Sequence, residues 1–524
     1  MRGQGLNCAK INIIADLVKT LDVFIFLIRR LQMSEICVRF APSPTGYLHI
    51  GGLRTALFNF LYARHMGGRF VLRIEDTDRT RFVEGALENL IKIMKWSGLE
   101  YDEGPMLDDK GVLHQEGKFG PYIQSERVEK NIYKPYIDKL LDEGKAYYCF
   151  CSQERLDKVR EEQKAQGLTA RYDGHCRNIS REEAEARISK GEPYVIRLKL
   201  PENEDVTFYD RIKGEITINT DEMDDQVLIK SDGFPTYHFA VVVDDHTMGV
   251  THVVRGEEWI SSTPKHVLLF RALGWKEPEF IHLPTVLGND HKKLSKRQGD
   301  VSVESFNEKG YLPQALVNYI ALLGWSPKSN KEIMSMDEMI EEFDFDRVAK
   351  RGGIFDIKKL NWFNQEYIKN MKAEDLVKYI EKYLKKAGLI DDSYPYEKLL
   401  LLAETYGNRI EYFAQVPEMT RHFFCKSQDL EYEEDAKEAL VSEEAKVLLP
   451  IFYKKIKEAD KFDKDFASGL VKSIQEESGI KGKKLWFPIR SAVVGSASGP
   501  DFTNTMLVLG RDEILSRLDR AMKI

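Results

Sequence analysis

The feature that most constrains the fold is an alternation of strand-like and helix-like segments between residues 36 and 74. A β-type run at 36–40 is followed by a loop, and apolar residues then recur at helical spacing across 53–61. Gly67 and Gly68 come next, as is typical of a helix C-cap, and a second β-type run covers 70–74. This strand–loop–helix–strand order predicts the opening of a parallel α/β sheet.

Two further β-type runs, Tyr237–Val243 and Thr251–Val254, predict a second part of the same sheet. More than 150 residues lie between the two parts. They are richer in charge and turn signals, so we expect an inserted α+β domain. Beyond residue 370 strand signals fade, and amphipathic segments such as 373–384 and 436–449 predict helices. The expected fold is an α/β sheet split by an insertion and followed by an all-α region.

Residues 1–32 stand apart from this pattern. Their longest apolar run, Val23–Ile28, has six residues, whereas a bilayer-spanning helix needs roughly 20. Arg29 and Arg30 follow the run, although a secretory signal places its positive charge first. We therefore expect no membrane segment, a natural start at Met33, and an upstream extension or a peripheral helix at 1–32.

The composition narrows the classes of protein. At about 150 residues per domain, 524 residues amount to three or four domains. Lys and Arg number 77 against 84 Asp and Glu, and the net charge of -7 argues mildly against a protein that coats nucleic acid through charge alone. Six cysteines are too few for a disulfide scaffold, which favours a cytoplasmic protein. Cys8, Cys37 and Cys425 are scattered, and we interpret them as small buried hydrophobic residues.

The loop at 42–52 runs directly into the first predicted helix. A helix N-terminus gathers unpaired N–H groups and the positive end of the helix dipole, which suits a phosphate. Gly51 and Gly52 let a phosphate chain approach the backbone, and His49 can donate a hydrogen bond to it. The alternative is an ordinary βα loop with a satisfied histidine, and for an isolated His-x-Gly-Gly we favour it by about three to one.

A second motif is the basic segment at 292–297, which holds four cations and one hydroxyl. Lys293 and Lys296 could neutralise the charge that develops on a leaving pyrophosphate. A solvated basic loop is the simpler interpretation when this segment is taken alone.

Together the two motifs resemble the paired signatures of class I aminoacyl-tRNA synthetases. Residues 49–52, His-Ile-Gly-Gly, resemble the HIGH signature, and residues 293–297, Lys-Leu-Ser-Lys-Arg, resemble the KMSKS signature. Gly52 and Arg297 replace the last residue of each signature, as is usual in the glutamyl subgroup. Longer blocks resemble bacterial-type glutamyl-tRNA synthetases, and the resemblance runs from Met33 to the C-terminus; these blocks are 39–52, 73–78 and 253–259.

The resemblance implies an ATP-dependent ligase. Such an enzyme activates L-glutamate with ATP and Mg²⁺ to glutamyl-adenylate, then transfers the glutamyl group to the 3'-terminal adenosine of tRNA(Glu). Activation in this family usually requires bound tRNA. The resemblance also implies a monomer with an N-terminal extension at 1–32, a Rossmann-type catalytic domain at 33–135 and 236–300, an inserted acceptor-stem-binding domain at 136–235, a stem-contact region at 301–370 and a helical anticodon-binding region at 371–524.

The same resemblance assigns the site residues. Chemistry supports two of them, because arginine binds carboxylates in bidentate fashion and both Arg39 and Arg255 follow apolar strand-like runs. Ligands of open α/β sheets collect at the carboxyl ends of strands. The alternative for each residue is a surface ion pair or a packing tyrosine. The implied residues are His49, Lys293 and Lys296 for catalysis; these three with Thr45, Gly51, Gly52 and Ser295 for ATP; and Arg39, Ala41, Ser43, Glu75, Tyr237 and Arg255 for glutamate.

Cys149, Cys151 and Cys176 form a cysteine cluster in the predicted insertion. Zinc takes four ligands in structural sites, and two close thiolates followed by a third could supply three of them. The C-x-C spacing departs from the usual C-x-x-C. Some family members add a Tyr four residues before the last Cys, which is Tyr172 here, and His175 is an alternative fourth ligand. We expect a structural zinc site; three thiols around a helical hairpin are the alternative.

Val243–His246 together with His252 could be drawn as a carboxylate–histidine metal site. We prefer a different interpretation, in which the segment is a strand end whose polar groups cap turns and face the nucleotide pocket. The implied reaction needs no catalytic metal there.

The C-terminal region is expected to bind tRNA. Residues 454–490 hold ten Lys and Arg against six Asp and Glu, a local positive excess. Trp486 and Phe487 offer stacking surface near Lys481, Lys483 and Lys484. A solvated amphipathic helix with a core tryptophan is nearly as good an interpretation.

Four other functions are compatible with parts of the sequence. Glutaminyl-tRNA synthetases typically have Pro-Glu-Pro-Asn where this chain has Pro42–Thr45, and their C-terminal region is β-rich. A truncated relative that glutamylates a tRNA base lacks the C-terminal domain. A silent RNA-binding paralogue would not be expected to retain the motifs. A non-discriminating enzyme that also charges tRNA(Gln) with glutamate stays open.

Overall fold

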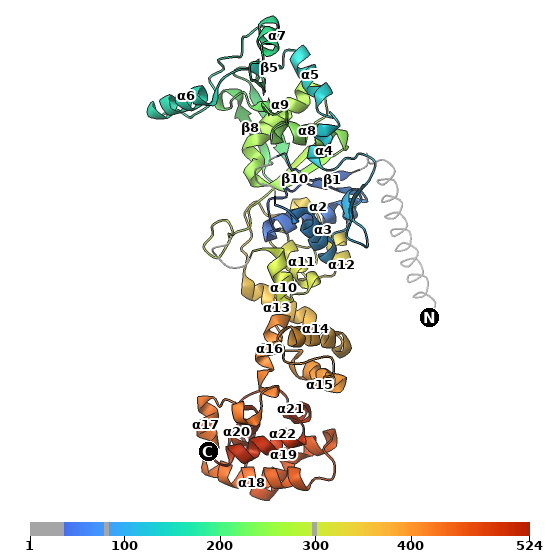
Figure 1. Cartoon of the computed structure of the whole chain (residues 1–524), viewed down its shortest axis with the longest axis vertical. Helices are drawn as coiled ribbons and strands as arrows, with labels where there is room; N and C mark the ends of the chain where they lie inside the picture. Colours follow the sequence, from blue (N-terminus) through green and yellow to red (C-terminus); the bar gives the residue numbers. More distant parts are fainter. Residues whose placement is uncertain (1–35, 78–82, 296–300) are drawn as a thin grey trace, which may run out of the picture. The chain divides into compact units, whose positions relative to one another are not determined.

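The computed structural model describes residues 36–77, 83–295 and 301–524. The predicted N-terminal extension therefore lies outside the described residues. The chain forms two compact units (Figure 1). The first comprises the described residues up to Glu304 and Val317–Phe355, and the second comprises Ser305–Leu316 and Asp356–Ile524.

A six-stranded sheet organises the first unit, in the order β2-β1-β10-β11-β7-β8. The pairs from β2 through β7 are parallel, and β7 and β8 form an antiparallel hairpin. The sheet confirms the predicted parallel α/β arrangement. Its strands are β1 (Cys37–Phe40), β2 (Arg69–Leu72), β7 (Asp205–Asp210), β8 (Gly214–Asn219), β10 (His252–Gly256) and β11 (Glu279–Leu283).

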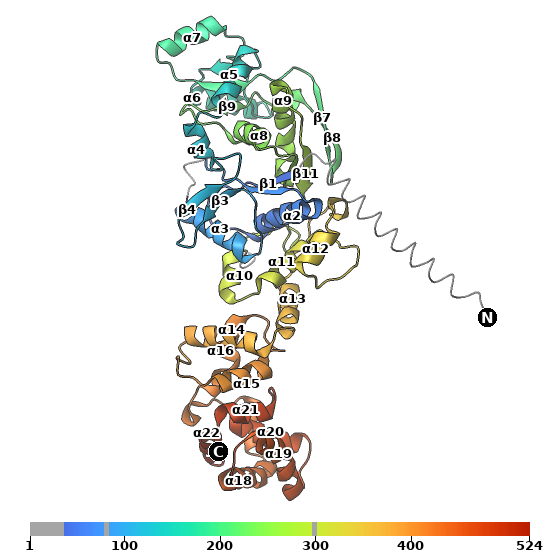
Figure 2. The same ribbon diagram turned by 90° about the vertical axis from the view of Figure 1, so that its right-hand side faces the viewer.

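Helix α2 (Ile50–Met66) connects β1 to β2, as the sequence predicts. It begins at His49, whose ring accepts a hydrogen bond from the Gly52 amide. It ends at Gly67, which has a left-handed φ of 64° and confirms the predicted C-cap. Figures 1 and 2 show α2 and α3 (Ala86–Trp96) on one side of β1, and α8 (Tyr237–Thr247) and α9 (Thr263–Leu273) on the other.

Helix α8 corrects one prediction. We predicted a strand over Tyr237–Val243, but these residues are helical and continue to Thr247. Phe239–Asp245 are all buried, so the helix has no polar face to give a helical period. A short apolar run has the same sequence pattern in a buried strand and in a buried helix. Packing in the fold overrides the strand preference of the three valines. The strand predicted next along the chain is present as β10.

A smaller antiparallel sheet, β5-β6-β9, occupies the predicted insertion. The β7–β8 hairpin also lies within residues 136–235, yet it pairs with β11 in the main sheet. Another hairpin, β3–β4, precedes the insertion. The remaining elements of this part are β3 (Gly104–Leu107), β4 (Leu113–Glu116), α4 (Gln124–Glu129), α5 (Lys134–Asp142), β5 (Ala146–Cys149), α6 (Gln153–Ala165), α7 (Arg181–Ser189), β6 (Val195–Leu198) and β9 (Val227–Ile229).

The described part of the second unit contains helices and no β-strand, which confirms the predicted all-α region. Two hydrophobic cores hold it together, one around Ile380 and one around Leu448. No described helix of the protein is both long and apolar enough to cross a membrane. Three α-helices lie between residues 301 and 356: α10 (Val303–Lys309), α11 (Pro313–Ala321) and α12 (Met336–Glu342), of which α12 belongs to the first unit. The main helices that follow in the second unit are α13 (Ile357–Lys369), α14 (Ala373–Lys386), α15 (Tyr396–Tyr406), α17 (Glu434–Leu440), α18 (Glu443–Glu458), α19 (Lys464–Ser478), α20 (Lys483–Val494), α21 (Phe502–Leu509) and α22 (Arg511–Ala521).

Candidate active site

A cavity of about 820 Å³ opens at the carboxyl ends of β1 and β10. It is the place where ligands of open α/β sheets bind. Lys296 lies outside the described residues. All other predicted glutamate-binding and ATP-binding residues line the cavity: Arg39, Ala41, Ser43, Thr45, His49, Gly51, Gly52, Glu75, Tyr237, Arg255, Lys293 and Ser295.

The start of α2 supplies one wall of this cavity. The Nδ1 atom of His49 accepts a hydrogen bond of 3.1 Å from the Gly52 amide, which leaves its Nε2–H available as a donor. Burial and the nearby Lys293 charge lower the pKa of His49, against an opposing effect of Glu258. A Cβ atom at Gly52 would lie 2.7 Å from Leu48 Cδ1, so a side chain there would have to displace the end of Leu48. This wall is therefore a helix N-terminus that offers a neutral imidazole as a hydrogen-bond donor and lets a ligand approach the backbone at Gly51 and Gly52.

The basic segment forms a tight loop on another wall. Gly288 donates its amide to the Lys292 carbonyl at 2.8 Å, and Leu294 donates to Val286 at 2.9 Å. His291 adopts a left-handed φ of 59° in the turn. These bonds leave the Lys293 side chain exposed at the cavity. Among the described residues no carboxylate forms an ion pair with Lys293, so its cation is open to a phosphate.

Arg39 reaches the cavity from β1 but is held by the protein. Its Nε atom lies 3.0 Å from Asp245 Oδ1, and its Nη1 atom donates to the Val254 carbonyl at 3.2 Å. Burial raises the pKa of Asp245, but Arg39 and Arg73 more than offset this and lower it overall. The charge of Arg39 is therefore partly neutralised within the protein.

Asp244 and Asp245 do not have the role that we predicted for them. They lie on α8 rather than at a strand end, and both are buried instead of facing the nucleotide pocket. Asp245 pairs with the fully buried Arg73 at 2.8 Å, and Asp244 pairs with Arg127 at 2.7 Å. Buried charges need such partners. The acidic pair therefore organises buried arginines behind the cavity.

Glu75 belongs to the same buried network. Its Oε1 atom lies 3.0 Å from Arg73 Nη2, and the side chain is almost wholly buried. Burial raises its pKa, while Arg73 and Arg39 act in the opposite direction. This carboxylate is anchored by one arginine and lines the cavity, where it can accept hydrogen bonds from an ammonium group.

Arg255 at the end of β10 is the second arginine of the cavity. Its Nη1 atom donates to the Tyr237 hydroxyl at 3.3 Å, and its Nη2 atom donates to Thr263 at 2.8 Å. The Tyr237 ring packs on Trp259 with centroids 4.2 Å apart. Two cations and one anion thus converge on the cavity, which suits a ligand with two carboxylates and one ammonium.

Comparison with known proteins assigns the family. A model of the catalytic domain of class I tRNA synthetases (E and Q) matches residues 35–362. The chain belongs to this synthetase family. A model of an anticodon binding domain matches residues 369–522, so this helical part of the second unit is the anticodon-binding part of the synthetase.

Relatives within the family are similar over most of their length. A glutamate–tRNA ligase of Finegoldia magna is 56% identical over 490 residues, covering 94% of this chain and 100% of the relative. One from Clostridioides difficile is 51% identical, covering 92% of this chain and 98% of the relative. A solved glutamate tRNA ligase of Elizabethkingia meningosepticum, in complex with its amino acid, is 38% identical with a TM-score of 0.84, covering 94% of this chain and 99% of that one.

The predicted cysteine cluster comes together in the insertion of this synthetase. The three sulfur atoms of Cys149, Cys151 and Cys176 lie within 4.8 Å of one another. The Tyr172 hydroxyl lies 3.4 Å from Cys149 Sγ and 3.9 Å from Cys151 Sγ. Hydrogen bonding from Cys176 lowers the pKa of Cys149, against the effect of burial. His175, the alternative fourth ligand, is exposed and is not part of the group.

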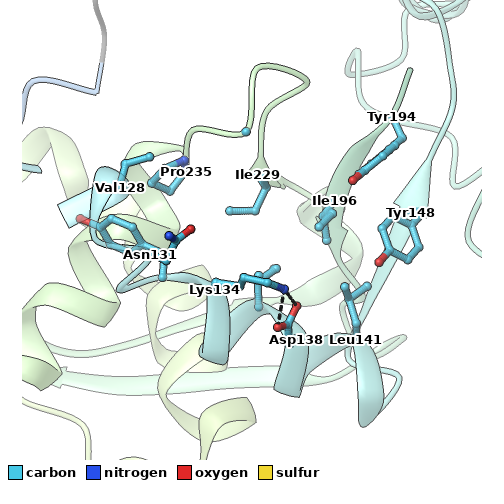
Figure 3. Close-up of a pocket in the computed structure, with 13 residues that line it drawn as sticks. Val128, Asn131, Lys134, Asp138, Leu141, Tyr148, Tyr194, Ile196, Ile229 and Pro235 are labelled. Atoms are coloured by element: carbon cyan, nitrogen blue, oxygen red, sulfur yellow. Dashed lines mark hydrogen bonds and ion pairs between the residues drawn. The ribbon is translucent and has the colours of Figure 1, made fainter. Parts of the chain in front are cut away.

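A second pocket, of about 240 Å³, lies in the insertion between α5 and the smaller sheet (Figure 3). Tyr148 and Tyr194 meet edge to face there, with ring centroids 5.1 Å apart. Lys134 and Asp138 form an ion pair of 2.7 Å at its edge. None of the predicted site residues lines it, so the motif residues gather in the larger cavity.

Sequence reasoning missed two buried histidines beside Arg255. His266 lies within the apolar helix α9, and His282 lies at the carboxyl end of β11. Both are almost fully buried, and both approach the guanidinium group at 3.1 Å. A histidine within an apolar run is ordinarily taken as a core residue. The end of β11 offered a signal, because it meets the same sheet edge as Arg255.

Proposed function

We propose that this protein is a glutamate–tRNA ligase that activates L-glutamate with ATP and transfers it to the 3'-terminal adenosine of tRNA(Glu). The observation that carries the proposal is the convergence of Arg39, Arg255 and Glu75 on the cavity that also holds His49 and Lys293. One cavity then offers partners for both ends of glutamate beside a phosphate-binding wall. The glutamate–tRNA ligase of Finegoldia magna, which is 56% identical to this chain, supports the proposal.

In this proposal the amino acid is held by charge. Arg255 and Arg39, with Ser43, bind the two carboxylates, and Glu75 accepts hydrogen bonds from the ammonium group. Tyr237 closes the side of the cavity by packing on Trp259. Ala41 lines the same part of the cavity, where its small side chain leaves space for the substrate.

The nucleotide, as its Mg²⁺ complex, lies along the start of α2. Thr45, Gly51, Gly52 and Ser295 line that part, and His49 donates through Nε2. A carboxylate oxygen of glutamate attacks the α-phosphorus, a P–O bond to the β-phosphate breaks, and pyrophosphate leaves. Lys293, and Lys296 from outside the described residues, stabilise the developing negative charge. The protein contributes position and charge, and no side chain forms a covalent bond to the substrate.

The second step uses tRNA(Glu) as the acceptor. A ribose hydroxyl of its terminal adenosine attacks the activated carbonyl, and AMP leaves. The anticodon-binding part is proposed to select the tRNA. The predictions of a monomer and of a cytoplasmic location stay predictions.

A structural zinc ion is proposed for the cysteine cluster of the insertion. The residues fit the ion, because Cys151 and Cys176 have sulfur atoms 3.6 Å apart and tetrahedral zinc–sulfur bonds of about 2.3 Å need a similar spacing. Cys149, Cys151, Cys176 and Tyr172 would hold it, and the ion would tie β5 to the following loop. Elemental analysis of protein purified without chelators should find zinc, and Cys176→Ser should remove it while Cys425→Ser should not.

Charging assays test the proposed function. Purified tRNA(Glu) and tRNA(Gln) are each incubated with ATP and either glutamate or glutamine. We expect glutamyl-tRNA(Glu) and no product with glutamine. Glutamylation of tRNA(Gln) would identify the non-discriminating activity, and a failure to charge tRNA(Glu) would refute the proposal.

A further inference from the structure

Arg255 is held by neutral groups. Its Nε atom donates to His282 Nε2 and its Nη1 atom to His266 Nδ1, both at 3.1 Å. Tyr237 and Thr263 accept two further hydrogen bonds. These bonds use four of the five N–H groups of the guanidinium. In the described part of the chain no partner of Arg255 carries a negative charge, and burial lowers its pKa.

The hydrogen bonds also fix the state of both imidazoles. Arginine can only donate, so His282 Nε2 and His266 Nδ1 must be unprotonated acceptors. His282 Nδ1 then carries the proton and donates to Asp210 Oδ2 at 2.7 Å. His266 Nε2 carries the other proton and donates to His238 Nδ1 at 3.0 Å. Each ring is thereby held in one tautomer by a partner on its far side.

Asp210 is placed to orient His282 without touching Arg255. It ends β7, and its Oδ1 atom accepts the amides of Ile212 at 2.9 Å and Lys213 at 2.7 Å. Its Oδ2 atom also accepts the His282 amide at 2.9 Å. The register pairs Arg255 directly with His282 on neighbouring strands. The carboxylate is thus fully hydrogen-bonded, and an imidazole ring separates it from the guanidinium.

The two arginines of the cavity therefore differ in kind. Arg39 lies 3.0 Å from the Asp245 carboxylate, while Arg255 has only neutral partners in the described residues. A buried cation without a counter-ion attracts an anionic ligand strongly, because no protein anion must be displaced. The neutral acceptor atoms of His266 and His282 orient the guanidinium group by hydrogen bonding and do not neutralise its charge.

We propose that His266 and His282 are positioning residues that orient Arg255 through neutral acceptor atoms, so that its full charge is available to a carboxylate of the substrate. This inference rests on the proposed function, in which Arg255 binds glutamate. Neither histidine is expected to touch the substrate. Their effect is exerted through Arg255.

The test is a series at position 266 that separates hydrogen bonding from charge. Asn and Asp have the same shape, and each can present an oxygen atom close to the position of Nδ1. His266→Asn keeps a neutral acceptor, His266→Leu removes the acceptor, and His266→Asp supplies an acceptor that neutralises Arg255. The readout is the KM for glutamate and for ATP in tRNA(Glu) charging, with thermal melting as the check on folding.

We expect His266→Asn to raise the KM for glutamate by less than about 5-fold and His266→Asp by more than about 30-fold, with His266→Leu between them. The KM for ATP should change by less than about 3-fold in all three. His282→Gln, which keeps an acceptor near Nε2, should behave like His266→Asn and covers the case in which a variant at 266 fails to fold.

Two results overturn the inference. If His266→Asp binds glutamate as well as His266→Asn, a structural hydrogen bond is all that the site needs. If all variants affect glutamate and ATP equally, the histidines support the fold and not Arg255. Either result leaves the proposed function intact, since the unmodified protein charges tRNA(Glu) in the same assay; failure of the unmodified protein to do so would refute both.

Discussion

For the single residues Arg39 and Arg255, the sequence predicts the position of the side chain but not its hydrogen-bond partners. The position of each arginine at the end of an apolar strand was predictable, because that edge collects ligands. Their partners were not. Asp245 is 206 residues from Arg39, and only the sheet order and the helical state of 237–247 bring them together.

The fixed orientation of Arg255 gives the first prediction. Arg255→Lys should raise the KM for glutamate by about 10- to 100-fold, because an ammonium group cannot replace a planar guanidinium that four hydrogen bonds hold in place with its fifth N–H group left for a carboxylate. The KM for ATP should change by less than about 3-fold. Steady-state charging measures both. Arg271→Lys, at an exposed arginine that pairs with Glu277, is the matched control, and equal losses for glutamate and ATP would contradict the role.

A buried histidine of the second unit gives a prediction about pH. Burial and the charges of Arg517 and Arg490 lower the pKa of His422 to about 4. An unfolded histidine titrates near 6.5, so the unfolded chain binds more protons in the window between the two values. Stability must then fall as the pH falls through that window. When the pH is lowered from about 7 to about 5, this histidine should reduce the free energy of unfolding by about 1–2 kcal/mol.

Urea unfolding of the protein and of His422→Gln at both pH values checks this. The variant should lose less free energy of unfolding on acidification than the unmodified protein, by the amount given above. Identical losses would mean that His422 is not responsible. His114→Gln is a control of the opposite kind, since a hydrogen bond to Glu116 raises the pKa of that exposed histidine.

Elements that end in turn residues were predicted well, and fully buried elements were not. The first strand, α2 and its glycine cap follow from periodicity and from two adjacent glycines. Helix α8 was mistaken for a strand because every residue from Phe239 to Asp245 is buried. The predicted cavity residues come together because they follow strands or begin helices, whereas His266 lies within an apolar helix as its fourth residue.

The junction between α2 and β2 gives a prediction at this scale. A Cβ atom at Gly68 would clash with the Ile36 carbonyl oxygen, which is backbone and cannot move aside alone. Gly68→Ala should therefore destabilise the protein by about 2 kcal/mol. At Gly469, inside α19, a Cβ atom would meet nothing within 4 Å.

Gly469→Ala is the matched control, because alanine favours a helix over glycine by about 1 kcal/mol. Chemical unfolding followed by circular dichroism should show opposite signs for the two changes. A stabilising Gly68→Ala would show that the Ile36 backbone shifts away without cost.

At the scale of the whole molecule, the net charge of -7 did not predict the partner. A synthetase binds one folded RNA through local surface, so a total charge says little about it. In the anticodon-binding part, Lys481, Lys483 and Lys484 are all exposed, and Trp486 is 40% exposed instead of being a core residue. This leaves the predicted combination of cations and an aromatic surface open to solvent.

Replacing Lys481, Lys483 and Lys484 together with alanine should raise the KM for tRNA(Glu) by about 10-fold and leave the KM for glutamate unchanged. The slope of the logarithm of the tRNA binding constant against the logarithm of the salt concentration should also become less negative by about two, because fewer counterions are released. Triple replacement of Lys92, Lys95 and Lys110, which are exposed in the first unit, is the control. An unchanged salt slope would exclude these lysines from the tRNA contact.

The β7–β8 hairpin limits how this protein can be re-engineered. A chimera that exchanges residues 136–235 with those of another enzyme would remove two strands of the main sheet along with the smaller sheet. It would also remove Asp210, and with it the anchor of His282. A portable module must therefore combine the residues before Asp205 with β9, the last strand of the smaller sheet, while the hairpin stays with the host.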